Sequence, residues 1–287
     1  VMYWNRGLFA SANVAQTPRL WNDFLSLAPK ITSLDTSSAV RRSAVSLGEW
    51  RNIKNAKAIL STLFMQAGDR IVARGVDGTP QSVLGLTPDT AAENPAQSAL
   101  RFYTEFANPG KTVYSWNRSL PEAQDAFVAG NVAVYFGFAS ELATIAGRNP
   151  NLSFGVEVVP QIQNNGARLT FGRVTGMAIS RSGRNPQGAL IVVQRMTSQS
   201  IGTFMTGATG LPPVRRDVSL DTSASAAAST FAQSALIARG WLDPAPLESN
   251  TVFQTMIESV ASGRSSPAEA ISDAAHTLEQ LLQSKRL

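Results

Sequence analysis

Apolar residues recur at helical spacing along most of this chain, and a few short continuous apolar runs separate the helical segments. Between residues 18 and 31, apolar side chains return every three or four positions, which predicts a helix. The same spacing, closed by Gly, Pro or Asn, predicts further helices over 52–66, 90–107, 121–129, 139–147, 186–197, 200–206, 223–237, 250–262 and 267–284. The last helix has a clear start, because Ser266 can cap it and Glu269 follows three residues later.

The continuous apolar runs predict strands. Residues 132–136, Val-Ala-Val-Tyr-Phe between Gly130 and Gly137, are typical of a buried strand, and residues 1–5, 153–159 and 168–180 have a similar character. Strands that alternate with helices predict an α/β protein with a mixed or parallel sheet.

Composition narrows the functional classes. Hydrophobic residues make up 44% of the 287 and charged residues 16%, as in globular domains. No apolar run approaches the roughly 18 residues that span a bilayer. The chain has no Cys and one His, His276, within the last predicted helix, so thiolate sites are excluded and we expect neither a metal nor a cofactor.

The net charge of +5 raises nucleic acid as a partner. The basic residues are scattered, however, and the tightest pairs, Arg41-Arg42 and Arg215-Arg216, stand alone. A nucleic-acid face normally gathers basic residues along one stripe, so we expect no nucleic-acid partner.

Four segments resemble, in the correct order, the extracellular solute-binding proteins of bacterial ABC importers, of the maltose or sugar type. They are YWNRGLF followed by TPRLWNDF near the start, DAFVAGNVAVYFGFAS at 125–140, the stretch from TFGRVTGMAIS to GLPPVRRDV at 170–218, and MIESVASGRSSPAEAISDAAHTLEQLL at 256–282. Each segment alone is weak, whereas four in order over nearly the whole chain are specific.

The resemblance implies a two-lobed, type II periplasmic-binding-protein-like α/β fold, in which ligand binds between lobes that close about hinge strands. Residues 1–170 and 219–287 would form the C-terminal lobe. Residues 171–218 would be a hinge crossing and a return segment of the N-terminal lobe, most of which, with an export signal, would lie upstream of residue 1. The implied function is capture of a mono- or oligosaccharide and its delivery to a membrane ABC permease, in an extracellular or periplasmic protein that is secreted or lipid-anchored.

Other ligands stay open at this stage. Related binders take peptides, polyamines or glycerol phosphates, and the basic charge is compatible with an anionic ligand. A sensor that presents its ligand to a membrane receptor would bind that ligand between two closing lobes in the same way.

A sugar cleft needs flat aromatic faces and planar polar groups. Aromatic residues in loops escape the core periodicity, which makes Trp50, Trp116 and Trp241 candidates for ligand contact, together with Asn55 at the start of a helix. Trp21 lies on an apolar helix face and Trp4 in the hinge strand, and we expect both to be packing residues.

Three further candidates surround the second and third matching segments. Phe138 follows Gly137 where, by the resemblance, the maltose-type family offers a stacking aromatic. Tyr135 alternates with Phe136, so one of the two points away from the core side unless helices cover both faces. Arg173 could donate to hydroxyls or to a carboxylate, or it could be a surface-paired arginine.

The enzyme alternative is a carbohydrate hydrolase, which needs two carboxylates across a cleft. The acidic candidates Glu49, Asp69, Glu105 and Asp125 lie mostly next to helix ends. The chain also lacks a G-x-S-x-G elbow, a P-loop and a G-x-G-x-x-G motif. We therefore expect a binding protein with no catalytic residues.

Overall fold

The computed structural model describes residues 1–86, 94–163, 168–218, 226–243 and 245–284. In chain order its elements are β1 (Met2–Asn5), α1 (Arg6–Ser11), α2 (Asp23–Ile31), β2 (Ser33–Leu34), β3 (Val40–Val45), α3 (Ala56–Gln66), β4 (Val72–Arg74), β5 (Pro80–Ser82), α4 (Pro95–Glu105), α5 (Ala123–Val128), β6 (Val132–Phe136), η1 (Ala139–Glu141), α6 (Leu142–Arg148), β7 (Phe154–Glu157), β8 (Thr170–Phe171), α7 (Pro186–Met196), α8 (Gln199–Thr209), α9 (Ala226–Leu236), β9 (Ala238–Arg239), α10 (Pro246–Ala261) and α11 (Pro267–Ser284).

The main sheet has the strand order β2-β3-β6-β1-β7. β3 runs parallel to β6, with Val45 opposite Val134, whereas β1 runs antiparallel to both β6 and β7. All five residues of β6 are buried, because this strand is flanked by strands on both sides and covered on both faces. The sheet is therefore mixed, as the alternation of strands and helices predicted.

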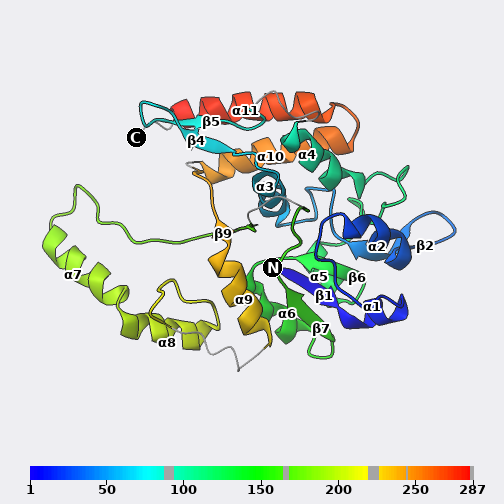
Figure 1. Ribbon diagram of the computed structural model, residues 1–287, viewed down its shortest axis with the longest axis horizontal. Coiled ribbons are helices and arrows are strands. Elements are labelled where there is room, and N and C mark those ends of the chain that lie inside the picture. The colour runs from blue at the N-terminus through cyan, green and yellow to red at the C-terminus, as the bar shows by residue number, and fades with distance from the viewer. Residues whose placement is uncertain (87–93, 164–167, 219–225, 244, 285–287) are drawn as a thin grey trace.

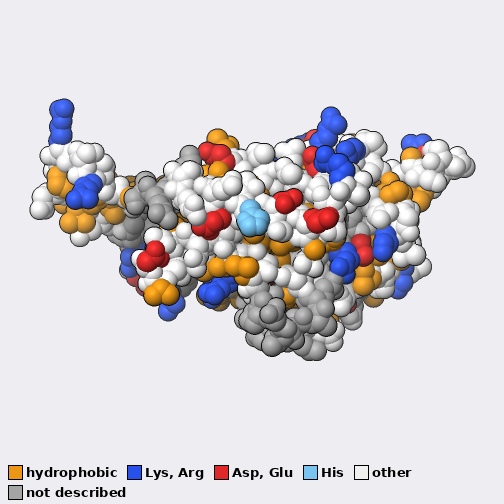
Figure 2. All heavy atoms as spheres, turned by 90° about the horizontal axis from the view of Figure 1, so that it is seen from above, with side chains coloured by type: hydrophobic (Ala, Val, Ile, Leu, Met, Phe, Trp, Pro, Cys, Tyr) orange, Lys and Arg blue, Asp and Glu red, His pale blue; other side chains and the backbone are white. Residues whose placement is uncertain are grey.

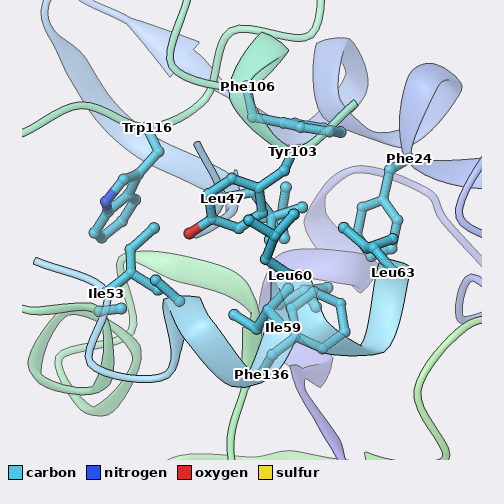
Figure 3. Packing of buried hydrophobic residues seen from close by; sticks show 14 of the residues in the cluster. Phe24, Leu47, Ile53, Ile59, Leu60, Leu63, Tyr103, Phe106, Trp116 and Phe136 are labelled. Carbon is cyan, nitrogen blue, oxygen red and sulfur yellow. The ribbon is translucent and has the colours of Figure 1, made fainter. Parts of the chain in front are cut away.

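One hydrophobic core joins the sheet to the helices that cover it. Phe136 from β6 packs with Phe24 of α2, while Leu60 and Leu63 of α3 are buried in the same cluster (Figure 3). On the side of α3 away from the sheet, α10 and α11 pack on each other, and α11 also covers the β4–β5 hairpin (Figure 1). His276 is exposed on α11, on the face shown in Figure 2.

Residues 172–218, called the arm below, leave this body between β8 and β9. Residues 172–185 run outward without regular structure to α7 and α8, which lie far to one side of the sheet in Figure 1. The strand predicted over 168–180 is therefore wrong beyond its first residues: only Thr170 and Phe171 form β8, paired in parallel with β9, since the chain then departs from the body and has no neighbouring strand to pair with.

Most predicted helices are confirmed: α7 and α11 begin at the predicted residues, α8 and α10 begin earlier, and others begin later. The helix predicted from residue 18 begins at Asp23, because the side chain of Asp23 accepts hydrogen bonds from the amides of Arg19 and Leu20 in a preceding turn. Residues 90–93 and 223–225, at the starts of two predicted helices, lie outside the described residues. Pattern reasoning missed β3, whose first half exposes two arginines.

Candidate functional site

The carboxyl ends of β3 and β6 meet at one edge of the sheet, where β1 also begins. Because β3 and β6 are parallel neighbours, the loops that follow them, residues 46–55 and 137–138, emerge side by side. Ligand sites in open α/β sheets lie at such carboxyl edges. The arm leaves the body close by, since Phe171 donates its amide to Thr62 Oγ1 on α3 at 3.1 Å.

Phe138 is at the centre of this edge. Its amide donates to Glu141 Oε1 at 2.8 Å, and its carbonyl accepts from the hydroxyl of Tyr3 at 2.7 Å. Its half-buried ring meets the ring of Phe171 edge-on, with centroids 6.5 Å apart, and the Arg173 guanidinium lies 5.3 Å from the ring centroid. Phe138 thus connects the main sheet to the base of the arm.

A hydrogen-bond network lies beneath Phe138. The carboxylate of Glu141 accepts from Asn55 Nδ2 at 3.0 Å, from the hydroxyl of Tyr135 at 2.5 Å and from Gln124 Nε2 at 2.6 Å. Burial, with the nearby charge of Glu141, raises the pKa of Tyr135 well above its ordinary value. The tyrosine therefore keeps its proton and remains a donor to the carboxylate at every working pH.

A second group of aromatic residues, Trp241 and Phe253, lies beside α3. Trp241 stacks on Phe253, with centroids 6.0 Å apart, and its Nε1 donates to Ser61 Oγ at 3.2 Å. Lys57 lies over the Trp241 ring at 5.2 Å, and its Nζ donates to Asp243 Oδ2 at 2.6 Å. The loop before α10 is thereby fixed to α3, the helix that also contacts the base of the arm through Thr62.

Beside Phe138 lies a cavity of about 40 Å³, lined among others by Asn55, Thr62, Phe138 and Phe171. This volume is close to that of one water molecule, about 30 Å³, whereas ligand pockets commonly measure about 300–1,000 Å³. At this edge of the sheet the body therefore presents an open surface of aromatic and charged groups, here called the floor, and enclosing a solute there needs further surface on top of it.

The structure brings together most of the residues that the sequence proposed as ligand contacts. Phe138 and Arg173 touch each other, Asn55 and Tyr135 lie in the network below them, and Trp241 contacts the same helix, α3. Asn55 is buried, and its Nδ2 also donates to the hydroxyl of Tyr135 at 3.0 Å and to a β6 carbonyl.

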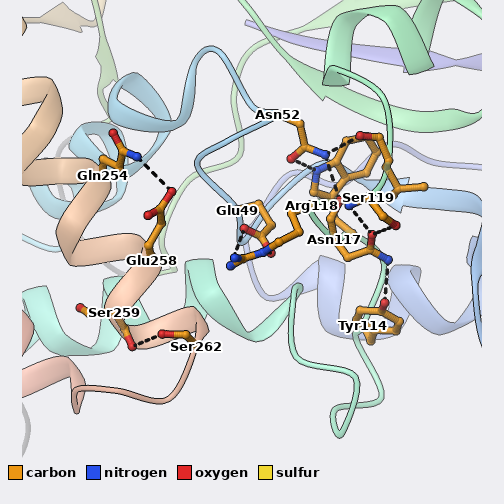
Figure 4. Close-up of polar contacts among 12 residues, drawn as sticks. Glu49, Asn52, Tyr114, Asn117, Arg118, Ser119, Gln254, Glu258, Ser259 and Ser262 are labelled. Atoms are coloured by element: carbon orange, nitrogen blue, oxygen red, sulfur yellow. Dashed lines mark hydrogen bonds and ion pairs between the residues drawn. The ribbon is translucent and has the colours of Figure 1, made fainter.

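Trp116 and Tyr135 have surroundings that differ from those expected of ligand contacts. Trp116 and Tyr135 are each 1% exposed, so neither presents a ring face to a solute in this structure. Trp116 Nε1 donates to Asn52 Oδ1 at 3.0 Å, and Asn52 in turn donates to two backbone carbonyls of the following loop (Figure 4). Trp50 is half-buried against the core. Core packing accounts for Trp116, and helices cover both faces of the strand that contains Tyr135. Trp50 is buried to the same degree as Trp241, so it stays a candidate contact.

Trp21 and Trp4 are packing residues, as expected. Trp21 is 4% exposed and donates from Nε1 to Gln66 at 2.7 Å, and Trp4 packs edge-on against Phe9.

Sequence reasoning missed Glu141, Lys57 and Phe171. The Glu141 signal was present, since it lies three residues after Phe138 at the start of a helical segment, the spacing of a side chain that caps a helix start. Lys57 and Phe171 gave no signal, because their partners lie more than 100 residues away in the chain: Asp243 for Lys57, and Thr62 for Phe171.

Within the described ranges, no three His, Cys, Asp or Glu side chains are grouped as metal ligands would be. Nor does that part of the chain contain a helix both long and apolar enough to cross a bilayer.

Comparison with known proteins agrees with this architecture. Residues 1–233 match the family model of bacterial extracellular solute-binding proteins. A protein of Brucella abortus that is named a binding protein is 24% identical over 98% of this chain, and the match spans 65% of that relative's length.

Solved structures show the same fold at low identity. A cyclo/maltodextrin-binding protein complexed with maltotetraose superposes with a TM-score of 0.75 at 17% identity, covering 100% of this chain and 69% of that one. An ABC transporter solute-binding protein of Thermotoga lettingae, bound to α-D-tagatose, gives a TM-score of 0.67 at 20% identity, covering 98% and 70%. Together the family match and the shared fold identify this chain as a member of the bacterial extracellular solute-binding proteins.

Proposed function

We propose that this chain is part of the substrate-binding component of an ABC importer, which captures a mono- or oligosaccharide in a cleft between two lobes and delivers it to a membrane permease. The observation that supports this function best is the group of Phe138, Phe171 and Arg173 at the carboxyl edge of the sheet, where the arm leaves the body. An aromatic face beside a multidentate donor suits the alternating apolar and hydroxyl surfaces of a sugar ring.

The arm supports the two-lobed arrangement. Along α7 and α8, large apolar side chains lie open, with Ile191 and Phe204 each 67% exposed; Figure 2 shows this part standing apart from the body. Single exposed apolar residues are ordinary, but a contiguous apolar surface marks an interaction site. We assign residues 1–170 and 219–287 to the C-terminal lobe, and residues 171–218 to a hinge crossing, which includes Arg173, followed by a return segment of the N-terminal lobe.

Closure would then place the second lobe over the floor formed by Phe138, Arg173 and Trp241. Hinge closure about short crossing segments is the usual movement of such clamps. Gly172 suits a crossing segment, because a Cβ on it would lie 2.7 Å from the Cβ of Ala238 in the neighbouring strand.

An anionic solute is the second candidate, and one observation favours it. Among the described residues Arg173 forms no ion pair, and its guanidinium rests on the Phe138 ring with its donors available. A phosphate or carboxylate would accept two parallel hydrogen bonds from it. Peptides, polyamines and a sensor role have no comparable support.

We propose no catalytic activity. Glu49, one of the carboxylates considered for hydrolysis, is paired with Arg118 at 3.3 Å, and Asp125 is paired with Arg148 at 2.7 Å (Figure 4 shows the first pair). We expect a bound sugar to be recovered intact after prolonged incubation, as measured by chromatography. The protein would act outside the cytoplasm, secreted or lipid-anchored.

The test is a thermal-shift screen of the full-length protein, with this 287-residue chain alongside, followed by calorimetry. The panel contains maltotriose, D-tagatose, glycerol 3-phosphate, spermidine and a tripeptide. Binding to the native state raises the melting temperature by mass action. We expect a saturable shift with one sugar in the full-length protein only, because in the proposed arrangement the N-terminal lobe supplies the other side of the cleft.

Phe138→Ala should weaken that binding about tenfold, the affinity equivalent of an aromatic contact. Leu25→Ala, on the outward face of α2, is the matched control and should leave affinity unchanged. A shift with glycerol 3-phosphate alone would favour the anionic candidate, and no shift with any compound would reject a binding role for this panel's solute classes.

A further inference from the structure

The loop that contains Phe138 is fixed by the partly exposed side chain of Glu141, both of whose carboxylate oxygens accept hydrogen bonds from within the protein. We propose that Glu141 is the positioning residue of the cleft: it holds the Phe138 ring in place and so sets ligand affinity without touching the ligand. This inference rests on the proposed function, which supplies the role of Phe138.

Four donors converge on Glu141. Oε1 accepts from the Phe138 amide at 2.8 Å and from Asn55 Nδ2 at 3.0 Å, and Oε2 accepts from the Tyr135 hydroxyl at 2.5 Å and from Gln124 Nε2 at 2.6 Å. These donors come from four different places in the fold: the Phe138 loop, the start of α3, the strand β6 and helix α5. One carboxylate therefore links the loops after both parallel strands to the rigid core.

The two oxygens of Glu141 are not equivalent. Oε1 bonds the backbone of the very residue whose ring forms the floor, whereas Oε2 is anchored to Tyr135 and Gln124 in the interior. Bonds between a carboxylate and neutral donors are stronger than neutral pairs, so the ionised side chain transmits the rigidity of the core to the loop.

The approach of Gly137 to the carboxylate leaves little room for the loop to shift. A Cβ at position 137 would lie 2.8 Å from Tyr135 Cε1 and 3.0 Å from Glu141 Oε2. The chain therefore passes directly over the carboxylate before it reaches Phe138. On the opposite side, the Tyr3 hydroxyl holds the Phe138 carbonyl.

Consequently, loss of the carboxylate should free the Phe138 loop while β6 remains folded. A ring that must be ordered on binding gives weaker affinity than one already in place. A merely structural residue would lower stability without moving Phe138, and this difference can be measured.

The experiment compares Glu141→Ala, Glu141→Gln and Asn52→Ala in the full-length protein. Asn52 is the matched control, because its amide group also makes three buried or partly buried hydrogen bonds but none to the Phe138 loop. Hydrogen exchange by mass spectrometry reports the peptide that contains residues 137–142, and calorimetry with the sugar identified in the screen reports affinity.

We expect exchange of the 137–142 peptide to rise at least tenfold in Glu141→Ala, and affinity to fall at least tenfold. Glu141→Gln keeps an oxygen for the Phe138 amide and should restore affinity to within about threefold of the wild type. Asn52→Ala should lower the melting temperature while leaving exchange at 137–142 and affinity unchanged. If Glu141→Ala does not fold, Glu141→Asp, which retains the charge but is one methylene shorter, replaces it with the same expected direction.

Unchanged exchange in Glu141→Ala, or equal affinity losses in Glu141→Ala and Asn52→Ala, would overturn the inference. The exchange measurement needs no ligand, so it decides the role of Glu141 even if no compound in the screen binds. Conversely, faster exchange with unchanged affinity would reject the link to binding and leave the proposed function intact.

Discussion

The buried carboxyl of Asp69 should contribute more to stability in mild acid than at neutral pH. Asp69 is 1% exposed and follows the end of α3, where both of its oxygens accept from the Gly85 amide at 3.1 and 3.2 Å. Burial raises its pKa from the ordinary 3.8 to about 6, against a smaller opposing effect of the Gly85 hydrogen bond.

The direction in which stability changes with pH follows from proton linkage. Between pH 4 and 6 the folded chain holds a proton on Asp69 that the unfolded chain releases, so unfolding is disfavoured by acid. Stability is then fully present below the unfolded pKa and falls as pH rises through about 6. Each pKa unit is worth about 1.4 kcal/mol, so the whole change amounts to about 3 kcal/mol.

The perturbation is Asp69→Asn, which is nearly isosteric and keeps an oxygen for the Gly85 amide but cannot ionise. We expect it to stabilise the protein by about 3 kcal/mol at pH 7.5 and by about 1 kcal/mol at pH 4.5, because at pH 4.5 the folded wild type is protonated whereas most of the unfolded chain has already released the proton. Urea unfolding followed by tryptophan fluorescence at several pH values measures the free energy of unfolding of both proteins.

Asp35→Asn is the control. Asp35 is hydrogen-bonded to Ser37 and to the backbone of the same turn, which lowers its pKa to about 2, so its titration lies below the tested range. The difference between Asp35→Asn and the wild type should therefore not change between pH 4.5 and 7.5. A difference between Asp69→Asn and the wild type that is equally independent of pH would refute the reasoning.

Three further changes test the packing around the candidate site and the last helix. Gly137→Ala should destabilise by about 1–3 kcal/mol, because its Cβ would press on the buried Tyr135 ring, and a urea midpoint equal to the wild type's would contradict this. Lys57→Met removes the cation that is 2.6 Å from a half-buried carboxylate, and we expect a loss of about 1–3 kcal/mol in the same assay. Ser266→Ala should cost about 1 kcal/mol, since Ser266 donates to Glu269 and caps α11; thermal unfolding that is unchanged within error would argue against the cap.

The elements whose evidence is local could be predicted from the sequence. The strand Val132–Phe136 and the helix Pro267–Ser284 have the predicted limits, because a continuous apolar run between glycines and a capped periodic segment each need only neighbouring residues to be recognised. β3 was missed because Arg41 and Arg42 interrupt its apolar pattern, and only pairing with β6 makes Val40–Val45 a strand.

The residues of the candidate site also fall into those that the local sequence could predict and those that only tertiary contacts place. The sequence by itself determined that Phe138 follows a buried strand, which is why it could be proposed as a contact, and the order of four segments determined the family. Only the tertiary structure decided that Trp116 is in the core, that Asn55 donates to Tyr135 and Glu141, and that Arg173 lies on Phe138. These outcomes depend on contacts between residues 35 to 86 positions apart, and periodicity along the chain carries no information on such pairs.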